Sequence, residues 1–161
     1  TKRQFREEGH RRRFLAIVDD SPECGKAVKY AARRAAAING GLTLAYVIEP
    51  ADFQHWLGVE EIMRSEAREE AEAALAKFGQ LARDSANVDT ELVTREGSIA
   101  TEIEELIQEN RDIAIMVLAA GDSKDGPGPL VASIAGRSAT FPIPVTVVPA
   151  TLTDEDIDDL V

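Results

Sequence analysis

The chain has 161 residues, of which 44% are hydrophobic and 29% charged, a balance that favours one folded domain with its own core. Its formal net charge of −11 argues against nucleic acids or anionic membrane surfaces as partners. The longest uncharged apolar run has eight residues, too few to span a membrane, and the single cysteine cannot form an internal disulfide, so we expect a cytoplasmic protein.

A basic arm opens the chain. Residues 1–13 hold six basic and two acidic side chains. The short apolar run Phe14–Val18 then predicts a buried strand. Ser21-Pro22 predicts the start of a helix, with Ser21 as the N-cap and Pro22 at the first helical position, and Asn39-Gly40 predicts its end.

The middle of the chain continues the alternation. Leu42–Ile48 predicts a second buried strand, and apolar residues at intervals of three and four predict a long helix over 59–82. The more mixed run Val88–Thr94 predicts a strand at the edge of a sheet. Ser98 is positioned to cap a third helix, whose apolar stripe runs over 99–107.

The last third begins with the apolar strand Ile113–Ala119, which a loop rich in glycine and proline follows. A short helix is predicted from Pro129 through Ile134 towards Ser138, and Val145–Val148 predicts a fifth strand. Residues 151–161 then hold five acids and no base. We expect both charged ends to be solvated; the alternative is that the basic arm contacts an acidic partner or the acidic tail.

This alternation predicts an α/β fold, with a five-stranded parallel sheet, helices on both faces and right-handed crossovers. It divides the chain into a basic arm (1–13), one domain (14–150) and an acidic tail (151–161). Ligands of such sheets bind beyond the carboxyl ends of the strands, where the winding reverses. Two loops lie at those ends: Asp19-Asp20-Ser21, and the loop after the fourth strand.

Asp19 has two interpretations that the residues leave open. Its carboxylate faces an adenine or ribose edge, or it accepts backbone N–H bonds within a turn. Asp20 is explained by its negative charge near a helix N-terminus. The pair does not predict the Mg²⁺ site of a phospho-acceptor receiver domain, because the third strand ends Thr94-Arg95-Glu96 and lacks an acceptor Asp.

Motifs of common enzymes are missing from the sequence. It contains neither a GxxxxGK[ST] phosphate loop nor a GxSxG nucleophile elbow, and its histidines and single cysteine do not form a cluster with metal-ligand spacing. No base, nucleophile and orienting group can be assembled from the motifs, so we expect at most a slow ATPase.

Five segments resemble the universal stress protein family in order and spacing: Phe14–Ser21, Leu44–Ile48, Arg95–Gly97, Val117–Gly121 and Phe141–Pro149. The resemblance covers residues 14–149. It implies a Rossmann-like sandwich with a role in stress response, paired as a homodimer through its last strand, Val145–Val148. Many members bind ATP through a G-x2-G-x9-G-[ST] loop after the fourth strand, whose N–H groups hold the phosphates.

The resemblance also implies a nucleotide site. An Asp that ends the first strand and a Val in the second would hold the adenosine, and the glycine loop would hold the phosphates of ATP with Mg²⁺. Carried over by position, with their close neighbours, the implied residues are Val18, Asp19, Asp20, Val47, Gly121, Gly126, Gly128 and Ser133.

The loop departs from the family motif. Gly121 matches the first glycine, but Lys124 stands at the second glycine position, and only the nearby Ser133 is available for the final Ser/Thr. Pro127 and Pro129 have no N–H to donate to a phosphate. Two functions therefore stay open: a small adenine-nucleotide sensor of stress or energy state, and a dimeric interaction module that binds no nucleotide.

Overall fold

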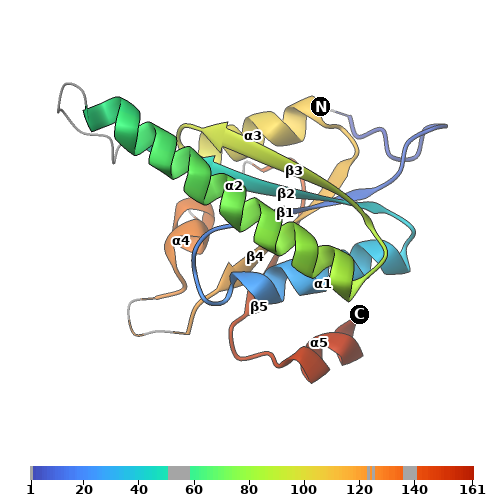
Figure 1. Ribbon diagram of the computed structural model, residues 1–161. Coiled ribbons are helices and arrows are strands. Elements are labelled where there is room, and N and C mark those ends of the chain that lie inside the picture. Colours follow the sequence, from blue (N-terminus) through green and yellow to red (C-terminus); the bar gives the residue numbers. More distant parts are fainter. Residues whose placement is uncertain (1, 51–58, 123, 125, 136–140) are drawn as a thin grey trace.

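The computed structural model describes residues 2–50, 59–122, 124, 126–135 and 141–161 (Figure 1). Strands and helices alternate along the chain, as the sequence predicts. In chain order the elements are β1 (Arg13–Ile17), α1 (Cys24–Ala37), β2 (Gly41–Ile48), α2 (Val59–Ser85), β3 (Asp89–Glu96), α3 (Ile99–Glu109), β4 (Ile113–Ala120), α4 (Pro129–Ala135), β5 (Val145–Pro149) and α5 (Asp154–Leu160). The predicted end of the fourth helix towards Ser138 lies outside the described residues.

The strands form one parallel sheet in the order β3-β2-β1-β4-β5, which confirms the predicted fold class. Winding runs outward from β1 in both directions, so the reversal lies between β1 and β4. The mixed run after α2 forms β3 at one edge, as predicted, and β5 forms the other edge.

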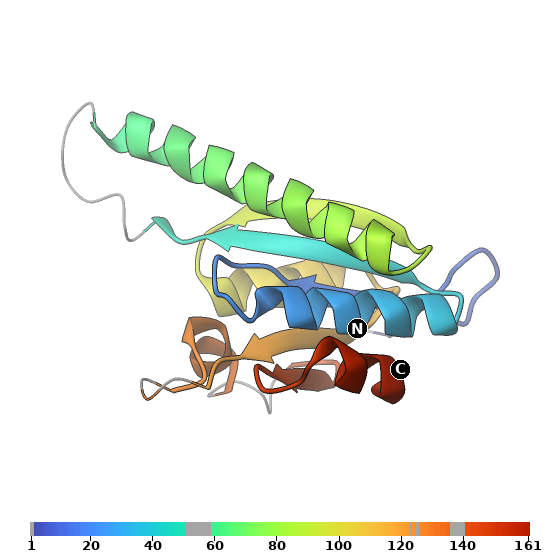
Figure 2. The same cartoon turned by 60° about the horizontal axis from the view of Figure 1, so that its bottom comes forward.

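Helices cover both faces of the sheet (Figure 2). Side chains of alternate strand residues point to opposite faces, because the side-chain period of a strand is two. Phe14, Ala16 and Val18 of the first strand segment pack with α1 and α2. Leu15 and Ile17 pack on the opposite face with α3 and α4.

Helix α1 meets the sheet through small side chains. Ala27, Ala31, Ala32 and Ala35 are all fully buried, with Val28 between them. A face of methyl groups lets a helix backbone approach a sheet closely while keeping high helix propensity. Beyond the last turn Asn39 has a φ of 54°, the left-handed conformation that the predicted Asn-Gly stop requires.

The start of this helix corrects the sequence prediction. The N-cap is Glu23 and not Ser21, and the first helical residue is Cys24. Ser21 is occupied elsewhere, because both its backbone N–H and its hydroxyl donate to Asp19 Oδ1, at 3.0 and 2.5 Å. Ser98 does occupy the N-cap of α3, but its side chain makes no capping hydrogen bond.

The basic arm is bound to the domain and lies at the amino ends of the strands. Arg3 Nη1 donates to the carbonyl oxygen of Ile107 at 2.7 Å, and to those of Asn110 and Ile113 at 3.3 Å. These contacts place a cation at the C-terminal end of α3, where the helix dipole favours positive charge. His10 Nδ1 lies 2.9 Å from Asp112 Oδ1. The expectation of a solvated arm is therefore wrong for these residues.

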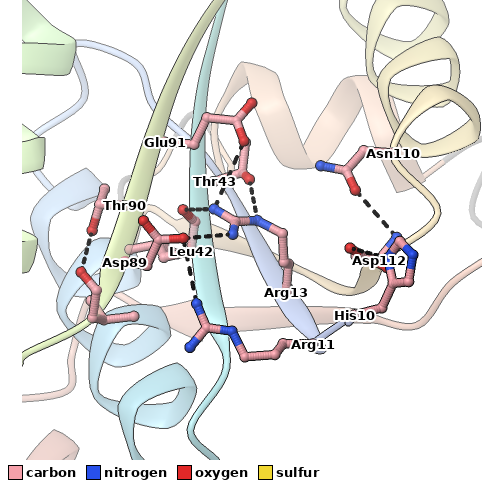
Figure 3. Close-up of polar contacts among 11 residues, drawn as sticks. His10, Arg11, Arg13, Leu42, Thr43, Asp89, Thr90, Glu91, Asn110 and Asp112 are labelled. Carbon is pink, nitrogen blue, oxygen red and sulfur yellow. Dashed lines mark hydrogen bonds and ion pairs between the residues drawn. The ribbon is translucent and has the colours of Figure 1, made fainter. Parts of the chain in front are cut away.

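Arg13 begins β1 and joins the amino ends of three strands (Figure 3). Its guanidinium donates to the Leu42 carbonyl at 2.7 Å, to Thr43 Oγ1 at 3.1 Å and to Asp89 Oδ2 at 3.1 Å. Arg11 also approaches the Asp89 carboxylate, at 3.7 Å. The polar network thus neutralises part of the arm's charge at the amino ends of the strands, opposite their carboxyl ends.

The acidic tail also differs from the expectation of a solvated segment. It folds into α5, whose N-cap Thr153 forms a capping box with Asp156. Ile157 is fully buried, and Asp158 pairs with Arg33 and Lys29 of α1. Among the described residues, the tail therefore forms its ion pairs with α1 and none with the basic arm.

Candidate functional site

A cleft of about 480 Å³ opens at the carboxyl ends of β1 and β2. Helix α2 forms one wall, and the residues that begin α4 form another. This volume falls in the range of small-molecule sites, and the position next to the β1–β4 reversal is where parallel sheets bind ligands. The lining residues are Val18, Asp19, Asp20, Tyr46, Val47, Ile48, Glu49, Met63, Glu66, Ala67, Glu70, Ile99, Pro129 and Leu130.

Four of the eight residues implied by the resemblance line this cleft. They are Val18, Asp19 and Asp20, from the end of β1 onward, and Val47, from β2. Asp19 combines features of both interpretations. Its Oδ1 accepts the Ser21 N–H in a turn, as the structural interpretation predicts, while the residue borders the cleft as the ligand interpretation requires.

The lining is acidic. Among the described lining residues, five carry carboxylates and none is a lysine, arginine or histidine: the acids are Asp19, Asp20, Glu49, Glu66 and Glu70. Burial raises the pKa of Tyr46, and the neighbouring Asp20 and Glu70 carboxylates raise it further, so its phenol is neutral at physiological pH. The described lining residues therefore offer apolar surface, hydrogen-bond acceptors and a phenol, but no cation.

The glycine loop between β4 and α4 lies beside the cleft and is closed by its own hydrogen bond. Gly121 N–H donates to the Pro127 carbonyl at 2.8 Å. Gly126 and Gly128 have φ values of 99° and 104°, conformations that L side chains rarely adopt. Glycine is thus required here by the turn itself, which explains these residues without a phosphate.

Glu23 lies against this loop, a contact that the sequence reasoning missed. A methyl group built on Gly121 would be 3.0 Å from Glu23 Oε1, and one on Gly128 would be 3.5 Å from the same atom. The two glycines therefore leave room for a carboxylate from α1. No local spacing signals this contact, because it joins the start of α1 to a loop about a hundred residues later.

The remaining implied residue is Ser133. It lies on α4, is exposed and does not line the cleft. The structure thus brings Val18, Asp19, Asp20 and Val47 together and places Gly121 and Gly128 beside them against Glu23. Gly126 shapes the loop, and Ser133 stands apart.

A triphosphate with Mg²⁺ does not fit the loop. The Gly121 N–H is already bonded, two loop positions are prolines without N–H groups, and the Glu23 carboxylate lies against the glycines. In the described part of the chain, no group of three His, Cys, Asp or Glu residues is arranged to hold a metal ion.

A model of the universal stress protein family matches residues 10–149. The chain belongs to the universal stress protein family. The fold agrees with this membership, since a five-stranded parallel α/β sandwich is what the resemblance implies. A comparison with curated proteins finds no match. Among the described residues, no helix is long and apolar enough to cross a membrane.

Solved structures of universal stress proteins share this fold at low identity. A universal stress protein from Lactobacillus plantarum is 18% identical, with a TM-score of 0.72, and the match covers 85% of this chain and 97% of that one. A universal stress protein in complex with cAMP is 20% identical, with a TM-score of 0.64, covering 87% and 98%. An Arabidopsis thaliana family member with AMP bound is 16% identical, with a TM-score of 0.63, covering 89% and 94%.

Proposed function

We propose that this universal stress protein binds an adenine nucleoside or nucleotide in the cleft beyond β1 and β2, and acts as a sensor in a stress response. The observation that carries the proposal is the cleft itself. It combines the size of a ligand site with Asp19 and Val47 at the ends of neighbouring strands. Family members of the same fold with cAMP or AMP bound support the choice of ligand class.

Asp19 is the acceptor expected to hold the ligand. An ionised carboxylate at the end of a strand can accept a hydrogen bond from a ribose hydroxyl or an adenine amino group. Val47 and Ile48 supply apolar surface on the neighbouring strand. The base would therefore be bound mainly by apolar contact, and the Asp19 bond would set its orientation.

Calorimetric titration with adenosine and with AMP tests the proposal. Saturable binding is expected, and Asp19→Ala should weaken it about tenfold or more, because a hydrogen bond to a charged group contributes roughly 1.5–3 kcal/mol. Ser21→Ala is the matched control, since it removes the hydroxyl bond to Asp19 within the turn but leaves the carboxylate.

A Ser21→Ala variant that loses as much affinity as Asp19→Ala would assign Asp19 to the turn and not to the ligand. Absence of binding to adenosine, AMP and cAMP alike would overturn the proposal. The second candidate function, a dimeric interaction module that binds no nucleotide, would then remain. The engaged Gly121 N–H and the carboxylate against the glycines favour that candidate.

A further inference from the structure

We propose that Glu23, which lies against the glycine loop beside the cleft, is a specificity-determining residue: it disfavours ligands with several phosphates and leaves the site to adenosine and its monophosphates. The inference rests on the proposed function, because it concerns which adenine ligands enter the same cleft.

The first step is the position of the carboxylate. Glu23 is the N-cap of α1, and its side chain reaches across to the loop after β4. Its Oε1 lies within contact distance of the place where a Cβ would stand on Gly121 and on Gly128. A phosphate bound by the loop N–H groups would have its oxygens about 2.9 Å from those nitrogens, so it would lie close enough to the carboxylate to be repelled by its charge.

The negative charge of Glu23 would repel a phosphate bound beside it. Among the ion pairs of the described residues, none involves Glu23. The carboxylate is half-buried, so water screens it less than it would a fully exposed group. A phosphate brought next to this charge is repelled, and each further phosphate adds to the repulsion.

Three described positions of the loop supply no donor that would offset this repulsion. The Gly121 N–H is bonded to the Pro127 carbonyl, and Pro127 and Pro129 have no N–H. Lys124 is the described cation of the loop, and it is exposed, so solvent screens its charge. Asp20, which lines the cleft near the start of α1, is a further acid on that side. Glu23 is not among the residues that line the cleft, so its charge acts on the phosphates and not on the base.

The test is a titration series with adenosine, AMP and ATP at constant ionic strength, with and without Mg²⁺. For the natural sequence, affinity should fall from adenosine to ATP. Glu23→Gln removes the charge and keeps the side-chain size, so ATP affinity should rise about tenfold, or ~1.4 kcal/mol. Adenosine affinity should stay within about twofold.

Glu72→Gln is the matched control. It also removes one carboxylate from the chain, but its residue is exposed on α2 and does not line the cleft. An equal rise in ATP affinity in this variant would show an effect of overall charge and overturn the inference. So would tighter binding of ATP than of adenosine by the natural sequence, a comparison that needs no variant.

The outcomes also separate the inference from the proposed function. Binding of adenosine with no change in ATP affinity in Glu23→Gln would leave the proposed function standing and overturn the role of Glu23. Loss of all adenine binding in the natural sequence and in the variant would overturn both. Binding of ATP only by Glu23→Gln would support both, with Glu23 as the excluding group.

Discussion

At Cys24 two physical effects act on the same sulfur in opposite directions. The residue begins α1, and a helix N-terminus favours a thiolate. It is also only 1% exposed, and burial raises the pKa of its thiol to about 12 from an ordinary value of 9.0. Desolvation is the larger effect, and Cys24 therefore serves as a small core residue.

Cys24 should consequently be almost unreactive in the folded protein. Because the pKa is raised, the thiol stays protonated as the pH rises through 8 and 9, and the thiolate at pH 8 is about one part in 10,000. Labelling with a thiol reagent at pH 8 should therefore be at least about 100-fold slower in buffer than in 8 M urea. Equal labelling rates in the two solutions would contradict the burial of this side chain.

The Asp19–Ser21 turn shows what a local pattern leaves undecided. Ser-Pro before an apolar stripe is a sound helix start, and the helix does follow. Ser21 is nonetheless not the N-cap, because its N–H and hydroxyl both donate to the carboxylate two residues earlier. Helix propensity ranks candidate caps, but it does not reveal that a neighbouring side chain holds the candidate in a different turn.

Among the elements, α5 is the helix that the acidic composition of the tail argues against, although its local sequence favours it. Its five acids suggested a solvated tail. The same residues contain Thr153 three positions before Asp156, the spacing of a capping box, and Ile157 directly after it. Negative charge in the first turn of a helix is stabilising, so acidity here belongs to the helix start.

The docking of α5 should be measurable as stability. Ile157 is fully buried, so Ile157→Ala should lower the free energy of unfolding by about 2 kcal/mol, from lost apolar contact and the cavity left behind. Leu160→Ala is the control on the same helix: Leu160 is 56% exposed, and its loss should cost less than about 0.5 kcal/mol. Urea unfolding followed by circular dichroism measures both variants, and equal midpoints would show that α5 is not docked in solution.

The order of the elements was accessible from sequence, whereas contacts between distant elements were not. Buried runs such as Ile113–Ala120 leave few alternatives to a central strand. The attachment of Arg3 to the end of α3, and of Glu23 to the glycine loop, depends on how separate elements pack. Neither the basic arm nor the single glutamate lies in a local sequence pattern that predicts these distant partners.

At the scale of the whole molecule, the two exposed edges of the sheet decide how copies of the chain can pair. We propose that β5 pairs with a second copy of the chain, since an exposed apolar edge strand is a template for further pairing. Val147 on this edge is 43% exposed. The β3 edge offers a comparison, because Leu92 there is 42% exposed and is flanked by acidic residues and Arg95.

Light scattering at micromolar concentration should therefore give a dimer mass. Val147→Glu brings one negative charge from each copy to the proposed interface and should shift the mass to that of a monomer. Leu92→Glu makes the same change at the other edge and should leave the dimer intact. A monomer mass for the natural sequence, or dissociation by Leu92→Glu alone, would contradict pairing through β5.

The alanine face of α1 has a consequence for ligand choice. Small buried side chains, most of them alanines, separate this helix from the sheet, so their size determines how closely the helix packs. Glu23 is at the N-terminus of the same helix, and the glycine loop follows strand β4. The distance between the carboxylate and the glycines therefore depends on how closely α1 packs on the sheet. A larger side chain at Ala27 or Ala31 would lift the helix and move the carboxylate away from the glycines. Core substitutions at positions that do not contact the ligand would thus change the affinity for ATP relative to adenosine.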